Sequence, residues 1–293
     1  MIQHLLQLIW NQRKQNAWLW AELLLVSVFL WFLVDYLYVM GRTYTAPLGF
    51  DIRHTYSIVI SSLSERSPDY IPKEKRERPD GVHLLTALDR IRTYPGVESA
   101  CLTDGGMPYY MGSRNLVWRI DTLQVPCRYA FVTPEFFDVF RIYDKDGKTA
   151  SLKRAIEDNN SIVISADVET MNPGLSLLGQ KAYRGNVTDE IEETIRGISV
   201  PIRRHEYTKA EPNVYRALRL SRMEEGYYEG MIDAVRLCVR VRPDVDNADF
   251  PARFRKDMAE QLRLGNLYLL DVQPLSYIRD GYIRSIGVEN EVK

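Results

Sequence analysis

Three short segments carry residue types that could act on a phosphate, a metal ion or an ester, and each lacks a necessary part. Residues 147–149 (GKT) resemble the end of a phosphate-binding loop, but Ile142 stands where the leading glycine belongs. His205 and Glu206 lack the second histidine of a metalloprotease helix. Residues 174–179 (GLSLLG) are one residue too long for a nucleophile elbow. We therefore expect no catalytic, metal-binding or cofactor-binding residues and no enzymatic activity.

The remaining polar candidates are scattered. The four histidines have no acid or cysteine partner at a ligand spacing, and residues 144–147 (DKDG) are too short for a calcium loop. The glycosylation patterns at 159–161 and 186–188 are common by chance.

The three cysteines, Cys101, Cys127 and Cys238, are an odd number without CxxC spacing, which excludes zinc and thioredoxin-type sites. An oxidising compartment would allow one disulfide at most. The sequence favours separate buried thiols in strands and leaves their pairing open.

An aromatic segment is the one candidate contact site. Tyr109, Tyr110 and Met111 follow two glycines and Pro108, which predicts an exposed loop suited to contact with a partner. A loop that packs its own side chains is the open alternative.

The composition belongs to an ordinary globular protein. Of the 293 residues, 45% are hydrophobic and 26% are charged, and 38 basic residues face 39 acidic ones, for a net charge of -1. This excludes a disordered, collagen-like or disulfide-scaffold protein and gives no reason to expect nucleic acid as a partner. The length allows two domains.

One segment is much more apolar than this average. Residues 17–40 would form a helix about 36 Å long, enough to span a hydrocarbon core of about 30 Å. We predict a transmembrane helix with lipid as its neighbour. Its candidate anchor residues are large apolar or aromatic side chains: Trp18, Trp20, Leu24, Leu25, Phe29, Trp31, Phe32 and Tyr36.

The flanking residues predict the orientation of this helix. Arg13 and Lys14 precede it, which places the N-terminus in the cytoplasm and the bulk outside. A cleaved signal peptide is disfavoured because no A-x-A-like site follows Met40. Residues 1–16 are expected to form a cytoplasmic or interfacial helix, with a simple extension of the anchor as the alternative.

The rest of the chain predicts an α+β fold. Strands are expected at 56–62, 97–102, 234–241 and 267–272, with helices beginning at Asp80 and Asp249. Strict alternation in 234–241 predicts a strand with one solvated face. Residues 50–105 and 221–285 are thus expected to form one βαβ subdomain, and 106–220, with short strands and turns, an inserted β-rich subdomain.

Three segments in order resemble the MacB-like periplasmic core domain. Residues 94–100 (YPGVESA) resemble its helix-to-strand junction, and 131–140 (FVTPEFFDVF) resemble its V-T-P-x-F-F-x-x-F segment. Residues 161–165 (SIVIS) with 178–180 (LGQ) are similar to a third stretch.

This resemblance implies a MacB/FtsX-type ABC transporter permease in the bacterial inner membrane, with a porter-like periplasmic domain. It implies that ATP binds to a separate cytoplasmic ABC ATPase subunit, with a homodimer or paralogous permease and a periplasmic protein as further partners. Such permeases transmit ATPase-driven motion.

The later membrane helices of this family are not in the sequence, so either a truncated permease or a short paralogue is expected. The alternative function is an extracytoplasmic ligand-binding sensor domain. An anchored hydrolase is disfavoured.

Overall fold

The computed structural model describes residues 10, 17–112, 114–185, 191–229 and 231–287. The chain divides into two compact units, one of residues 1–46 with 206–209, and a body of residues 47–205 with 210–293. The helix expected at 1–16, apart from Trp10, and the glycosylation pattern at 186–188 lie outside the described residues.

The first unit contains one long apolar helix, α2 (Ala17–Thr45), which has no buried residue among its 29. By length and composition it can cross a membrane. It continues beyond the expected end at Met40. Within the same unit, the rings of Tyr44 and Tyr207 lie 5.6 Å apart.

The strands of the body form one ten-stranded sheet in the order β10-β1-β9-β2-β4-β3-β6-β7-β5-β8. Their bounds are β1 Thr55–Ser62, β2 Val97–Asp104, β3 Asn115–Ile120, β4 Leu123–Val132, β5 Ser161–Ser165, β6 Lys181–Arg184, β7 Ile191–Ser199, β8 Asn213–Ala217, β9 Val235–Val241 and β10 Leu267–Pro274.

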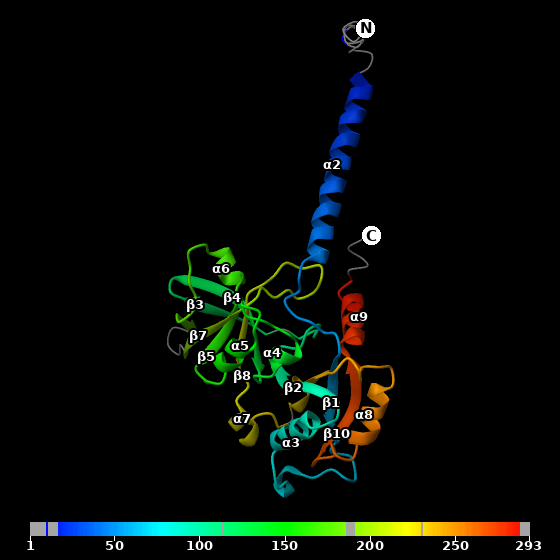
Figure 1. Ribbon diagram of the computed structural model, residues 1–293, viewed down its shortest axis with the longest axis vertical. Coiled ribbons are helices and arrows are strands. Elements are labelled where there is room, and N and C mark those ends of the chain that lie inside the picture. The colour runs from blue at the N-terminus through cyan, green and yellow to red at the C-terminus, as the bar shows by residue number, and fades with distance from the viewer. Residues whose placement is uncertain (1–9, 11–16, 113, 186–190, 230, 288–293) are drawn as a thin grey trace. The chain divides into compact units, whose positions relative to one another are not determined.

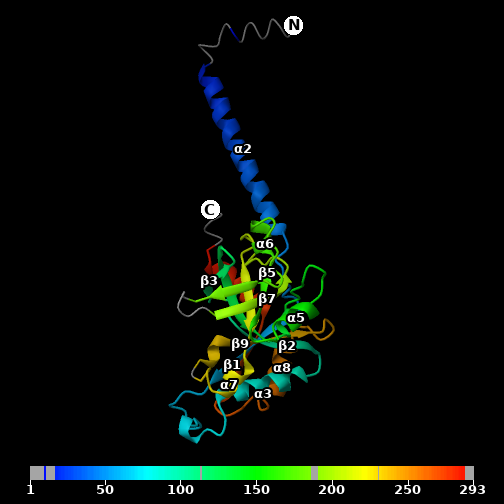
Figure 2. The same cartoon turned by 90° about the vertical axis from the view of Figure 1, so that its left-hand side faces the viewer.

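Helices and short helical turns connect the strands of this sheet, and several of them pack on it (Figures 1 and 2). Their bounds are η1 Lys73–Lys75, α3 Asp80–Arg92, α4 Phe136–Val139, α5 Ala150–Ala155, α6 Asp167–Met171, α7 Leu220–Glu224, η2 Ile232–Ala234, α8 Phe250–Met258 and α9 Leu275–Ser285. The fold is mixed α+β, as the sequence predicts.

Four antiparallel strands from both ends of the body, β10-β1-β9-β2, share one layer, and α3 and α8 cover one face of it. The helices contribute apolar residues at helical spacing to a common core: Leu84, Leu88, Ile91, Phe250, Phe254 and Met258. Asp249 occupies the expected N-cap but makes no capping hydrogen bond. Asp80, also expected to cap, is the first residue of α3, and its carboxylate pairs with Arg76 at 3.0 Å.

The other strands close on themselves. β4, β3, β6, β7, β5 and β8 pair in succession, and a parallel pairing of β8 with β4 completes a small barrel. Its interior holds buried side chains from these strands and the loops between them: Trp118, Ile120, Val125, Cys127, Ile162, Ile164, Leu177, Ala182, Ile195 and Val214.

The strand β9 corrects one expectation. Its alternation predicts a solvated face, but Cys238 and Arg240 on that face are both buried. The reason is that both faces of this strand, which lies between β1 and β2, are covered by other parts of the body. One face packs on the core of α3 and α8, and Cys238 on the other face packs in a second core with α4.

The three cysteines are free and buried, and Cys101 and Cys238 are register partners on β2 and β9. Burial, and then the adjacent Cys238, raise the pKa of the Cys101 thiol well above its usual value. Burial raises the pKa of Cys127 to about 12. Thiolates are the reactive form, so these thiols should be inert in the folded protein.

We therefore expect a maleimide to label no cysteine in the folded chain and all three after unfolding without reductant, as counted by mass spectrometry. Labelling of only Cys127 after unfolding would instead reveal a disulfide between the register partners.

Candidate functional site

The segment that follows α2 is fastened to the body before β1 begins. The Asp51 N–H donates to the Phe140 carbonyl at 2.8 Å, and the Arg203 N–H donates to the Leu48 carbonyl at 2.9 Å. The Val241 N–H donates to the His54 carbonyl at 2.9 Å. Residues 48–54, which we call the junction segment, are therefore bonded to three separate parts of the body.

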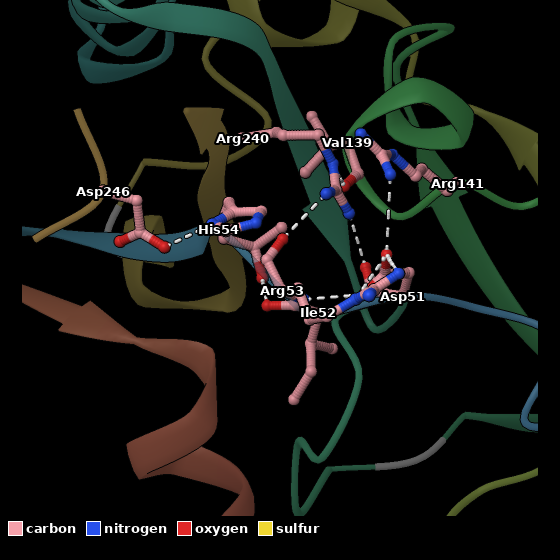
Figure 3. A network of polar contacts seen from close by, with 9 residues as sticks. Asp51, Ile52, Arg53, His54, Val139, Arg141, Arg240 and Asp246 are labelled. Atoms are coloured by element: carbon pink, nitrogen blue, oxygen red, sulfur yellow. Dashed lines mark hydrogen bonds and ion pairs between the residues drawn. The ribbon is translucent and has the colours of Figure 1, made fainter. Parts of the chain in front are cut away.

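A buried arginine lies at the centre of this arrangement (Figure 3). Arg240 on β9 is 1% exposed. Its guanidinium donates to the carbonyls of Val139, Arg53 and Asp51, each at 2.7 Å. The planar fork of arginine can reach several acceptors at once, so one side chain joins β9, the end of α4 and the junction segment.

Charges around Arg240 add to this network. Asp51 pairs with Arg53 at 3.0 Å and lies 3.8 Å from Arg141. Burial alone would raise the pKa of Asp51, but hydrogen bonds from Arg53 and the charge of Arg240 lower it. Burial, and then the charge of Arg141, lower the pKa of Arg240. The guanidinium nevertheless remains charged, because arginine is not deprotonated in proteins.

A second polar contact holds the start of β1. Asp246 accepts a hydrogen bond from the Tyr56 hydroxyl and lies 2.5 Å from His54 Nδ1. His54 has a left-handed backbone with φ of 59°. Burial and the neighbouring Asp246 raise the pKa of Tyr56, so the hydroxyl remains a donor at neutral pH.

Close backbone approach requires glycine at position 49. Gly49 has a φ of 85°, and a Cβ there would lie 2.2 Å from the Pro201 carbonyl oxygen. No larger residue fits without moving the backbone. The junction segment is therefore fitted closely against the body at Gly49.

This site consists of hydrogen bonds and ion pairs that join the junction segment to the body. Among the described residues, no group of three or more His, Cys, Asp and Glu side chains could hold a metal ion. The carboxylates of Asp51 and Asp246 are each occupied by the contacts above.

The residues singled out from the sequence lie elsewhere. Trp18, Trp20, Leu24, Leu25, Phe29, Trp31, Phe32 and Tyr36 all lie on α2 with exposed side chains. Tyr109 is buried, with rings of Phe50 and Tyr282 5.7 and 5.8 Å away, and Tyr110 lies beneath Arg236. Only Met111 of this trio is exposed.

Arg240 was missed in the sequence because an arginine in an alternating strand is typical of a solvated face. The available signal was that the same face also carries Cys238, a residue type most often buried.

We expect Arg240→Met to destabilise the folded protein by about 3–5 kcal/mol, because three carbonyls lose a charged donor in a buried site. Arg240→Lys should be intermediate, since one ammonium cannot reproduce the planar fork. Chemical unfolding of the full chain in maltoside micelles measures this. Arg263→Met, at an exposed pair with Asp69, is the control, and an equal loss there would contradict the role.

The lowered pKa of Asp51 predicts a pH dependence. Its ionised form stabilises the fold above its unfolded pKa of about 3.9, and this contribution is lost as pH falls through the lower folded pKa. Asp51→Asn should lower stability at neutral pH by about 1–2 kcal/mol and flatten the acid-side loss. Thermal unfolding between neutral and acid pH, with exposed Asp69→Asn as control, tests this; parallel wild-type and Asp51→Asn curves would refute it.

Comparisons with known proteins bear on the fold. No family model and no curated protein sequence matches the chain. A solved domain of a protein described as a permease from Porphyromonas gingivalis matches with a TM-score of 0.50 and 19% identity, covering 80% of this chain and 98% of that domain.

Two further solved structures match less well. The extracellular domain of the noncanonic ABC-type transporter YknZ from Gram-positive bacteria has a TM-score of 0.42 and 12% identity, covering 73% of this chain and 100% of that one. The periplasmic region of MacB from Actinobacillus actinomycetemcomitans has a TM-score of 0.42 and 10% identity, covering 84% and 98%. At the level of the fold the predicted resemblance is confirmed: the chain shares its architecture with the solved permease domain.

Proposed function

We propose that this chain is the membrane-anchored, extracytoplasmic part of a MacB/FtsX-type ABC transporter permease, which transmits ATPase-driven motion to periplasmic partners or cargo. The observation that carries the proposal is the junction segment. A helix able to cross a membrane ends at Thr45, and within a few residues the chain is bonded to three parts of a permease-like fold.

In this role α2 spans the inner membrane once, with Arg13 and Lys14 on the cytoplasmic side. The chain itself is non-catalytic, and ATP binds to a separate cytoplasmic subunit. A second copy or a paralogous permease completes the assembly. Residues 50–105 with 221–285 act as the porter-like subdomain and 106–220 as its β-rich insertion.

The junction explains how motion could pass between the subdomains without a moving catalytic group. Displacement of the segment after α2 acts on β9 through Arg240 and on the end of α4 through the Phe140 carbonyl, while Arg240 also holds the Val139 carbonyl. A mobile linker would dissipate such a displacement, whereas a hydrogen-bonded segment conveys it.

Topology is the first test. The buried native cysteines should not label, so Met111→Cys, at a side chain 59% exposed, provides a reporter in the body. A membrane-impermeant maleimide should label it in cells with a permeabilised outer membrane. Gln12→Cys, beside the basic pair that precedes the apolar helix, should label only after the inner membrane is opened. The reverse pattern would contradict the proposed orientation.

The second part of the test separates a permease from another anchored domain. The full chain, purified in maltoside from its own host, should bring with it an ATPase identified by its phosphate-binding loop, and ATP hydrolysis should be vanadate-sensitive. Arg240→Lys, in preparations shown to be folded, should retain the ATPase but weaken the coupling of hydrolysis to binding of the periplasmic partner. Purification without any ATPase would refute the permease function.

A further inference from the structure

A cavity in the body is lined mainly by arginines and tyrosines, and it borders the junction segment at Phe50 and Arg203. It lies between residues 105–110, β4, residues 202–204 and α9, and has a volume of about 40 Å³. One ordered water needs roughly 10–15 Å³. The cavity therefore has room for a group of several atoms.

Two guanidiniums that line this cavity form no ion pair with the residues that the structure describes. Arg128 and Arg204 are both half-buried, and the Nε atom of each is buried with no hydrogen-bond partner in that part of the chain. Burial, and then the charge of Arg204, lower the pKa of Arg128. The charge of Glu211 raises the pKa of Arg128, but in the described part of the chain the two side chains do not form an ion pair.

Several other arginines in the described part of the body have polar partners, although the Nε atom of Arg236 is also buried without one. Arg216 pairs with Glu193 at 2.5 Å, and Arg76 pairs with Asp80 at 3.0 Å. Arg240 is held by three carbonyls. Arg114, which also lines the cavity, pairs with Asp104 at 2.9 Å. Because buried charges are normally paired, two neighbouring cations left over indicate a missing counter-charge.

We propose that this cavity binds a phosphate group, either as the free ion or as the head group of a phosphorylated ligand. Two neighbouring guanidiniums without an ion pair in the described residues match the charge of a phosphate, about −1.5 to −2, better than that of a single carboxylate. Arginine guanidiniums also present paired donors that fit phosphate oxygens.

The walls of the cavity suit a charged group carried on a less polar body. Arg204 lies over the Tyr282 ring at 5.8 Å, and the buried Tyr109 and Tyr215 rings line the same space. The stacked guanidinium is held in place while its edge remains available to a ligand. This inference concerns the body alone and does not depend on the proposed transport function.

The test compares ligands on the full chain in a phosphate-free maltoside buffer. Inorganic phosphate should raise the unfolding temperature above that in potassium chloride of equal ionic strength, because a ligand that binds only the folded state stabilises it. Glycerol phosphate serves as the head-group probe. At least about tenfold tighter binding of glycerol phosphate identifies a head-group site, and the reverse order identifies a free-ion site.

The variant Arg128→Gln with Arg204→Gln should lose the phosphate response while keeping an unfolding temperature in chloride no lower than wild type, since two like charges have been removed. Each single variant should weaken phosphate binding at least about tenfold, which keeps the test valid if the double variant does not fold. Arg263→Gln should behave as wild type. An unchanged phosphate response in the Arg128 and Arg204 variants, or no response in the wild type, would overturn the proposal.

Discussion

The fold depends on one buried cation. Arg240 brings a charge into the interior, where desolvation is costly, and three carbonyls from separate segments offset this cost. Those carbonyls belong to the junction segment and to the end of α4, so satisfying the guanidinium requires both to lie against β9. The geometry of the chain between α2 and β1 follows from this requirement.

Packing on both faces of the sheet buries the Arg240 site. The four-stranded layer packs on α3 and α8, and its other face packs against α4 and the buried aromatic residues of segment 131–140. β2 pairs antiparallel with β4 over two register pairs, Thr103–Val132 and Asp104–Phe131. The barrel and the layer are thus joined by a narrow strip of sheet, and the contacts around Arg240 add a second connection between β9 and α4.

The sequence predicted elements where periodicity and burial agree. Strands β1, β2, β9 and β10 and helices α3 and α8 all lie where apolar residues repeat at the matching period. Prediction failed where a tertiary partner decides. Within the expected β-rich segment, the short β8 could not be singled out from the sequence because its pairing with β4 is distant in sequence.

The same limit applies to the sites. An arginine on an alternating strand looks solvent-exposed, and only the packing of α4 over β9 shows that Arg240 is buried. Tyr109 looked exposed because glycines and a proline surround it, yet Phe50 and Tyr282, distant in sequence, enclose it. Contacts between residues that are distant in sequence cannot be predicted from the local spacing of residue types.

Hydrogen exchange of backbone amides tests the central claim most directly. The Asp51 amide donates to the Phe140 carbonyl, and the Val241 amide donates to the His54 carbonyl. If the junction segment is part of the body, both amides should exchange as slowly as those in the core of β9. Exchange of the Asp51 amide at the rate of an exposed loop, with β9 still protected, would show that the segment moves independently and would contradict the account.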